Sequence, residues 1–139
     1  MKLHSDAHSG LNTISGYGSD YIQINQKTYQ HAVLVSPLGD IVAWPVASFA
    51  TLTEADFLQI CARQPELFIL GTGARQHFPK PELLKPLIQA RIGFEIMDSQ
   101  AACRTYNILM GEGRQVLAAI LLDTAWINPQ SNSVWRLPC

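Results

Sequence analysis

Apolar and polar positions change their spacing several times along the chain, and each change predicts a different element. Residues 21–24 alternate and residues 31–35 form a second extended run, with turn residues 25–27 between them, so this stretch predicts a β-hairpin. A further short strand is predicted over residues 41–44, which Pro45 ends. Residues 1–20 are polar and rich in Gly and Ser, which predicts an irregular lead-in.

The second half of the chain alternates between short apolar runs and stretches with helical spacing. Residues 67–70 and 116–122 are uninterrupted apolar runs, which are typical of strands buried on both faces, and residues 94–97 predict another strand. The predicted helices cover residues 53–64, 81–91 and 100–110. This order favours an α/β fold with three layers, and the N-terminal β-hairpin would make its central β-sheet mixed.

Length and composition fit one domain followed by a tail. The chain has 139 residues, of which 47% are apolar and 15% charged. A chain of this size buries enough surface to fold without a disulfide or a metal. We expect a single α/β domain over residues 1–122. The chain turns polar after Asp123, so we expect residues 123–139 to form a mobile or peripherally docked tail.

Charge and cysteine content exclude several classes of protein. Ten Lys and Arg balance 11 Asp and Glu, so we expect no nucleic-acid partner. The longest apolar run, residues 116–122, is far shorter than the roughly 20 residues of a membrane span, so we expect no transmembrane segment. Cys61, Cys103 and Cys139 are odd in number and lack the spacing of a zinc site. These features indicate unpaired thiols in the cytoplasm, with no metal and no cofactor.

The loop Gly71-Thr72-Gly73 is the first candidate site, because it directly follows a predicted buried strand. Open α/β sheets bind ligands at the carboxyl ends of their strands, and glycines let backbone N–H groups approach an anion. A dinucleotide-binding motif would need a third glycine where the chain has Gln76, and the P-loop sequence is absent. The loop therefore indicates either an anion-binding pocket or a tight turn without a ligand.

Polar side chains on the last predicted helix extend this hypothetical anion pocket. Arg104 and Asn107 lie three residues apart and share a helix face, and with Arg114 they can donate to a carboxylate or phosphate. The start of the same helix favours an anion. The alternative is that Asn107 and Arg114 bind backbone groups or Glu112 around the helix end. The candidate ligand-binding residues are Gly71, Thr72, Gly73, Arg104, Asn107 and Arg114.

Two further residues have reactive side chains. Cys103 lies on the apolar stripe of its predicted helix, where a lone cysteine usually acts as a small hydrophobic residue. His77 is the only histidine near the glycine loop, and a single histidine is weak support for a general base. We therefore predict no catalytic residue.

Several stretches of the second half form a recognisable pattern: L-F-I-L-G-T-G at residues 67–73, F-E-I-M-D at 94–98, and C-R-T-Y-N-I-L and E-G-R within residues 103–114. Together they resemble the Mth-type domain of unknown function, a family found in bacteria and archaea. The resemblance covers about residues 14–122, and Ser99 stands where the family is expected to have Thr. It implies a three-layer α/β domain with a mixed sheet. A mitochondrial relative of the family is assembly factor 3 of NADH:ubiquinone oxidoreductase (complex I).

The family carries no established reaction. It implies a protein-interaction or assembly role, with a pocket near Gly71, Gly73 and Arg114. We therefore expect a cytoplasmic, non-catalytic interaction or assembly-accessory protein with a protein partner. The alternative is a binder of, or an enzyme acting on, a small anionic metabolite at the glycine loop. A deep pocket with Arg104, Asn107 or Arg114 beside that loop would favour the metabolite, and an exposed apolar patch would favour the partner.

Overall fold

Side chains of strand β8 (Val116–Ile120) alternate between two separate halves of the core. In the computed structural model, which describes residues 10–122, every residue of β8 is buried. Ala118 and Ala119 are neighbours in the sequence but pack into different clusters, one on each face of the sheet. This follows from strand geometry, because successive side chains point to opposite faces. The prediction of a strand buried on both faces is confirmed.

β8 lies at the centre of a mixed five-stranded sheet with the strand order β5-β4-β8-β6-β7. It is antiparallel to β4 (Val33–Val35) and parallel to β6 (Leu67–Gly71). β7 (Gly93–Met97) continues the parallel part, and β5 (Val42–Ala43) forms the other, antiparallel edge. The mixed sheet of the expected fold is confirmed.

The predicted hairpin is part of a second, three-stranded antiparallel sheet, and one of its two strands differs from the prediction. β2 (Ile22–Ile24) pairs with β3 (Lys27–Tyr29) across a tight turn, in which Asn25 and Gln26 have φ angles of 54° and 73°. Two-residue hairpin turns require such positive values. The prediction that residues 31–35 form the second strand of this hairpin was wrong, because Val33–Val35 pairs instead with β8.

The third strand of this small sheet is β1 (Ile14–Tyr17), which pairs with β2. It lies within the segment predicted to be irregular, and its pairing is interrupted between Ile14 and Gly16. An interrupted strand of four residues leaves little alternation to detect in the sequence. Residues 1–9 and the predicted tail over residues 123–139 lie outside the described residues.

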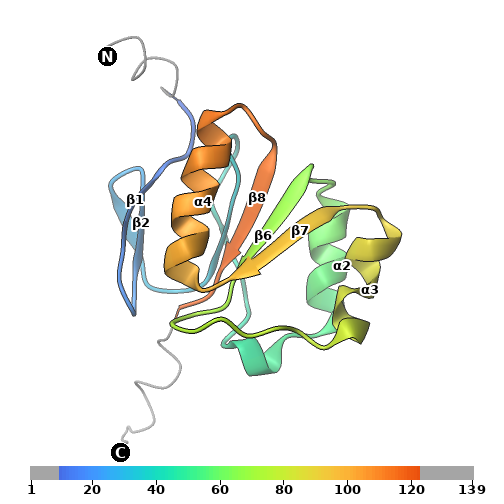
Figure 1. Cartoon of the computed structure of the whole chain (residues 1–139). Helices are drawn as coiled ribbons and strands as arrows, with labels where there is room; N and C mark the ends of the chain where they lie inside the picture. The colour runs from blue at the N-terminus through green and yellow to red at the C-terminus, as the bar shows by residue number, and fades with distance from the viewer. Residues whose placement is uncertain (1–9, 123–139) are drawn as a thin grey trace, which may run out of the picture.

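Helices cover both faces of the central sheet (Figure 1). α2 (Glu54–Ala62) and α3 (Pro81–Gln89) pack together on one face, preceded by the 3-10 helix η1 (Phe49–Thr51). α4 (Ser99–Gly111) covers the other face, with the three-stranded sheet packed beside it. α3 begins at Pro81, as predicted, and contains Pro86 in its interior. The three-layer prediction is confirmed.

The two strands that follow β6 in the chain lie on opposite sides of it, which decides where α4 lies. β7 is on one side of β6 and β8 is on the other. Right-handed crossovers then require α3 and α4 to lie on opposite faces of the sheet. The start of α4 consequently meets the loop after β6 at the carboxyl edge of the parallel strands, while its end lies at the amino edge.

Candidate functional site

The start of α4 packs closely against the end of β6. A Cβ added to Gly71 would lie 2.9 Å from the Oγ of Ser99 and 3.0 Å from the Cβ of Ala102. Such distances are too short for an ordinary side chain, so only a hydrogen fits between strand and helix. Helix packing therefore accounts for the first glycine of the predicted loop.

The Ser99 hydroxyl connects the loop, the helix and the end of the central strand. It donates to the Leu121 carbonyl at 2.6 Å and accepts from the Gly73 N–H at 2.8 Å. The Ser99 N–H also donates to the Gly73 carbonyl at 2.8 Å. Ser99 is fully buried, so no water can replace these bonds. The helix cap is the preceding Asp98, whose carboxylate accepts from the Ala101 N–H at 2.9 Å.

Backbone N–H groups of the predicted anion-binding loop donate to acceptors within the protein. The Thr72 N–H donates to the Met97 carbonyl at 2.9 Å, and the Gly73 N–H is held by Ser99. A cavity of about 310 Å³ lies beside Gly73, and Asp98 is part of its lining. A carboxylate at this position would repel an anion.

Asn107 attaches the three-stranded sheet to α4. Its side chain accepts from the Ile14 N–H at 3.0 Å and donates to the Ile14 carbonyl at 2.8 Å. Tyr106, from the same helix, donates to the Asn12 carbonyl at 2.8 Å. Asn107 therefore binds backbone groups, as the alternative interpretation of this residue expects.

Arg114 lies at the opposite edge of the sheet from the Gly71–Gly73 loop. Its Nε donates to Glu66 at 2.7 Å, and the Gln115 N–H donates to the other carboxylate oxygen at 3.1 Å. The Gln115 N–H and then the Arg114 guanidinium hold the pKa of Glu66 below its ordinary value. The five residues of β6 separate this ion pair from the loop by roughly 15 Å. Arg104 is exposed on α4, so the structure does not gather the six predicted residues into one pocket.

The two potentially reactive side chains lie in different surroundings. Cys103 is only 5% exposed. Burial raises the pKa of its thiol to about 12; the charge of Arg104 lowers this pKa and the charge of Asp98 raises it, and both effects are smaller than that of burial. The His77 ring packs against Phe49, with ring centroids 5.1 Å apart. Within residues 10–122, no group of three or more His, Cys, Asp and Glu side chains is placed to hold a metal ion.

We expect Cys103 to react with iodoacetamide at pH 8 at least about tenfold more slowly than Cys61, because alkylation requires an exposed thiolate. Burial raises the pKa of both thiols, but Cys61 is partly exposed. Mass spectrometry of the two alkylated peptides over time measures both rates. Equal rates would contradict the buried position of Cys103 and restore it as a candidate nucleophile.

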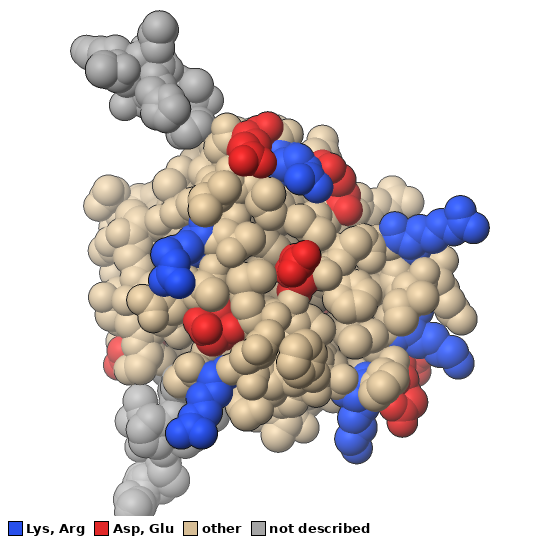
Figure 2. Space-filling view, viewed as in Figure 1, with Lys and Arg blue, Asp and Glu red and all other residues tan. Residues whose placement is uncertain are grey.

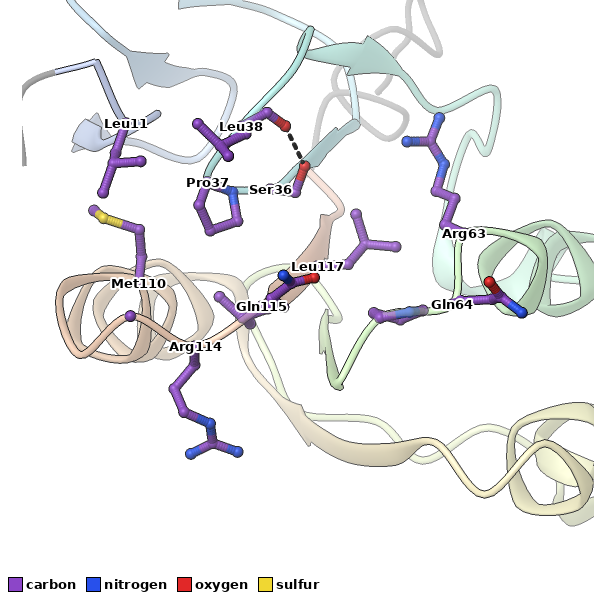
Figure 3. Close-up of a pocket in the computed structure, with 13 residues that line it drawn as sticks. Leu11, Ser36, Pro37, Leu38, Arg63, Gln64, Met110, Arg114, Gln115 and Leu117 are labelled. Carbon is purple, nitrogen blue, oxygen red and sulfur yellow. Dashed lines mark hydrogen bonds between the residues drawn. The ribbon is translucent and has the colours of Figure 1, made fainter.

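An open groove of about 450 Å³ lies at the amino edge of the sheet (Figure 3). It is bounded by the end of α4, the loop after β4 and the segment between α2 and β6. Its volume is in the range of known ligand sites. The apolar side chains that line it are Leu11, Pro37, Leu38, Pro65, Met110, Val116 and Leu117. Local sequence patterns do not predict this site, because its lining comes from segments far apart in the chain.

Polar side chains also line the groove. Arg63 and Gln64 follow α2, while Arg114 and Gln115 precede β8. Figure 3 shows the two arginines on opposite sides of the groove. Arg114 is paired with Glu66, but Arg63 forms no ion pair with any other residue of the described range 10–122. The groove therefore combines an apolar floor with an unneutralised cation.

Charges are mixed over the face of the molecule seen in Figure 2. Lys and Arg side chains on this face alternate with Asp and Glu and are separated by uncharged surface. A nucleic-acid-binding face would instead concentrate basic side chains. Charge on this face is thus mixed rather than gathered into one basic patch.

Comparison with known proteins identifies the family. A model of the family described as a protein of unknown function (DUF498/DUF598) matches residues 14–121. The chain belongs to this family. The predicted resemblance to the Mth-type domain is confirmed, since a solution structure from Bordetella pertussis, described as a Mth938-like domain, is 38% identical with a TM-score of 0.74. That comparison covers 83% of this chain and 88% of the other.

A second solved structure shares the fold over most of its length. A crystal structure of a Bordetella parapertussis protein is 46% identical with a TM-score of 0.77, covering 83% of this chain and 98% of that chain. The fold is therefore the one common to these bacterial proteins.

Curated relatives include assembly factors. NADH dehydrogenase (ubiquinone) 1 alpha subcomplex assembly factor 3 from Bos taurus is 35% identical over 83 residues, which cover 58% of this chain and 45% of the relative. The protein of the same name from Danio rerio is 30% identical over 86% of this chain and 68% of the relative. The chain thus spans about half the length of the mammalian relative that it matches.

A third relative is named as a membrane protein. The 13 kDa major membrane protein of Francisella tularensis is 37% identical over 62 residues, which cover 45% of this chain and 50% of the relative. Among residues 10–122 of the present chain, no helix has the length and apolar character needed to cross a membrane.

Proposed function

We propose that this protein is a cytoplasmic, non-catalytic accessory protein that binds a protein partner during assembly of a multi-subunit complex. Its likeness to assembly factor 3 of NADH dehydrogenase carries the proposal. The partner is defined here by the chemistry of the surface that binds it.

The polar groups around α4 support binding over catalysis. Ser99 and Asn107 use their side chains to bind backbone groups, and the Cys103 thiol is buried with a raised pKa. The groove at the opposite edge has an apolar floor and a polar rim, which is the usual composition of a protein interface.

Deletion of the gene in the organism that encodes the protein tests the assembly role. We expect the fully assembled NADH dehydrogenase complex to fall several-fold on native gels, with unchanged transcripts of its subunits. A plasmid copy of the gene should restore the complex. Unchanged amounts of all multi-subunit complexes on the gel would contradict the proposal.

A second candidate function is the binding of a small anionic metabolite at the Gly71–Gly73 loop. The observation in its favour is the cavity of about 310 Å³ beside Gly73 and the start of α4. The N–H groups of Thr72 and Gly73 already have acceptors, and Asp98 faces the same space. Arg104 is the only cation among the predicted residues on this part of α4.

We expect phosphate to leave the melting temperature unchanged relative to chloride at matched ionic strength, because the loop donors are already used. Thermal unfolding of the wild type and of Arg104→Gln in both salts measures the difference. A rise in phosphate that Arg104→Gln removes would establish the anion site and favour the metabolite function. The result does not depend on the groove, because Arg104 is not among the residues that line it.

A further inference from the structure

The groove at the amino edge carries an exposed apolar side chain at its rim. Leu38 is 72% exposed, although it stands beside the apolar lining formed by Leu11, Met110 and Leu117 (Figure 3). The backbone of this loop makes a local hydrogen bond, in which the Leu38 carbonyl accepts from the Ser36 hydroxyl at 3.0 Å. An exposed leucine beside an apolar floor provides a site for another large apolar side chain.

The charges around the groove indicate which residues would flank a bound apolar side chain. Arg63 and Arg114 line the groove, and the nearby Glu66 neutralises only Arg114. No Asp or Glu is among the residues that line it. Because Arg63 stays unpaired within the described residues, a carboxylate on a bound segment is favoured and a cation is disfavoured.

The polar rim suits a peptide chain. Gln64 and Gln115 stand next to the two arginines, and an amide side chain both donates and accepts hydrogen bonds. Backbone N–H and C=O groups of an extended segment need both kinds of partner. At about 450 Å³ the groove holds a few side chains, which is the size of a short linear segment.

We propose that this groove binds a short segment of a protein partner in which large apolar side chains are flanked by Asp or Glu. The inference rests on the proposed function, whose partner it describes. The apolar side chain lies between Leu38 and the groove floor, and an acidic side chain pairs with Arg63.

Three matched peptides test the chemistry of the segment. They are acetyl-Glu-Leu-Leu-Glu-amide, acetyl-Lys-Leu-Leu-Lys-amide and acetyl-Glu-Ser-Ser-Glu-amide. Titrations of the full chain, followed by NMR of leucine and methionine methyl groups, give the affinity and the location of each peptide. We expect the first peptide to shift the signals of Leu38, Met110 and Leu117, and to bind at least about tenfold more tightly than the other two, since apolar burial and charge pairing both contribute.

Matched protein variants separate the groove from general surface effects. Leu38→Ser should weaken binding of the first peptide about tenfold, whereas Phe78→Ser, at a residue 70% exposed on another loop, should not change it. Arg63→Gln should weaken it about threefold at low salt, while Arg75→Gln, at another exposed arginine, should not.

Several results would overturn the inference. Equal affinity for the acidic and basic peptides would contradict the proposed pairing with Arg63. NMR shifts confined to residues outside the groove would contradict the groove as the binding site. Dimerisation of the free chain that Leu38→Ser abolishes would show that a second copy occupies the groove. If any of these results is found but the deletion strain still loses the NADH dehydrogenase complex, the assembly role is retained. Only the groove is then rejected as the binding site for the partner.

Discussion

Replacing Ala119 with aspartate should prevent the protein from folding. Ala119 is fully buried in β8, between Leu34 of β4 and Leu70 of β6. An aspartate there would place a carboxylate among apolar side chains with no partner, at a cost of more than about 5 kcal/mol. The whole domain is expected to be stable by only about 5–15 kcal/mol.

The control for this variant is Ala55→Asp, which introduces the same side chain at an exposed position in the first turn of α2. A negative charge near a helix N-terminus is neutral or slightly stabilising. Circular dichroism and urea unfolding should show a cooperative transition for Ala55→Asp and none for Ala119→Asp. Native-state hydrogen exchange should also be slowest in β8, and fast exchange there would contradict its central position.

Ser99→Ala should destabilise the protein by about 2–4 kcal/mol, because it leaves the Gly73 N–H and the Leu121 carbonyl buried without their partner. Both bonds are short, at 2.8 and 2.6 Å, and Ser99 is fully buried. The loss of a helix N-cap alone would lower the free energy of unfolding by less than this. Ser99→Ala does not remove the cap of α4, because Asp98 supplies it. Urea unfolding measures the change in the free energy of unfolding.

Ser15→Ala provides the comparison for this prediction. Ser15 is exposed in β1, and its hydroxyl lies 3.3 Å from three partners: it donates to the Gln23 carbonyl or the Gln23 side-chain oxygen and accepts from the Gln26 N–H. Water can replace those bonds, so the change should stay within about 0.5 kcal/mol. Equal effects of Ser15→Ala and Ser99→Ala would show that the buried connection between loop, helix and central strand contributes nothing.

Local patterns in the sequence were sufficient for the elements of the parallel part of the sheet. β6 and β8 are buried on both faces, so nearly every position must be apolar, and this requirement is visible as an uninterrupted run. α4 packs with one face inward, which produces an apolar stripe at helical spacing. The resemblance to the family rests on the same segments and was confirmed over residues 14–121.

Pairing between distant segments was not predictable in the same way. Residues 31–35 were assigned to the hairpin because they follow the turn closely, yet Val33–Val35 pairs with Ala118–Ile120. A strand of three residues is too short for alternation to show which sheet it joins. The nearer candidate, β3, has two exposed residues and so lacks the apolar pattern of a strand.

The candidate site also has features that follow from local sequence and features that depend on contacts between distant segments. The sequence by itself determined the alternating strands and helices from β6 to β8 and the buried central strand, and it placed the Gly71–Gly73 loop and the start of α4 in one candidate site. Only the tertiary structure decided that Ser99 and Asn107 already bind backbone groups and that Arg114 pairs with Glu66 at the far edge of the sheet. The same edge holds an apolar groove whose Arg63 has no ion-pair partner among residues 10–122. The physical reason is that periodicity reports what each residue does within its own element, whereas hydrogen-bond partners and cavities depend on contacts between segments that are far apart in the chain.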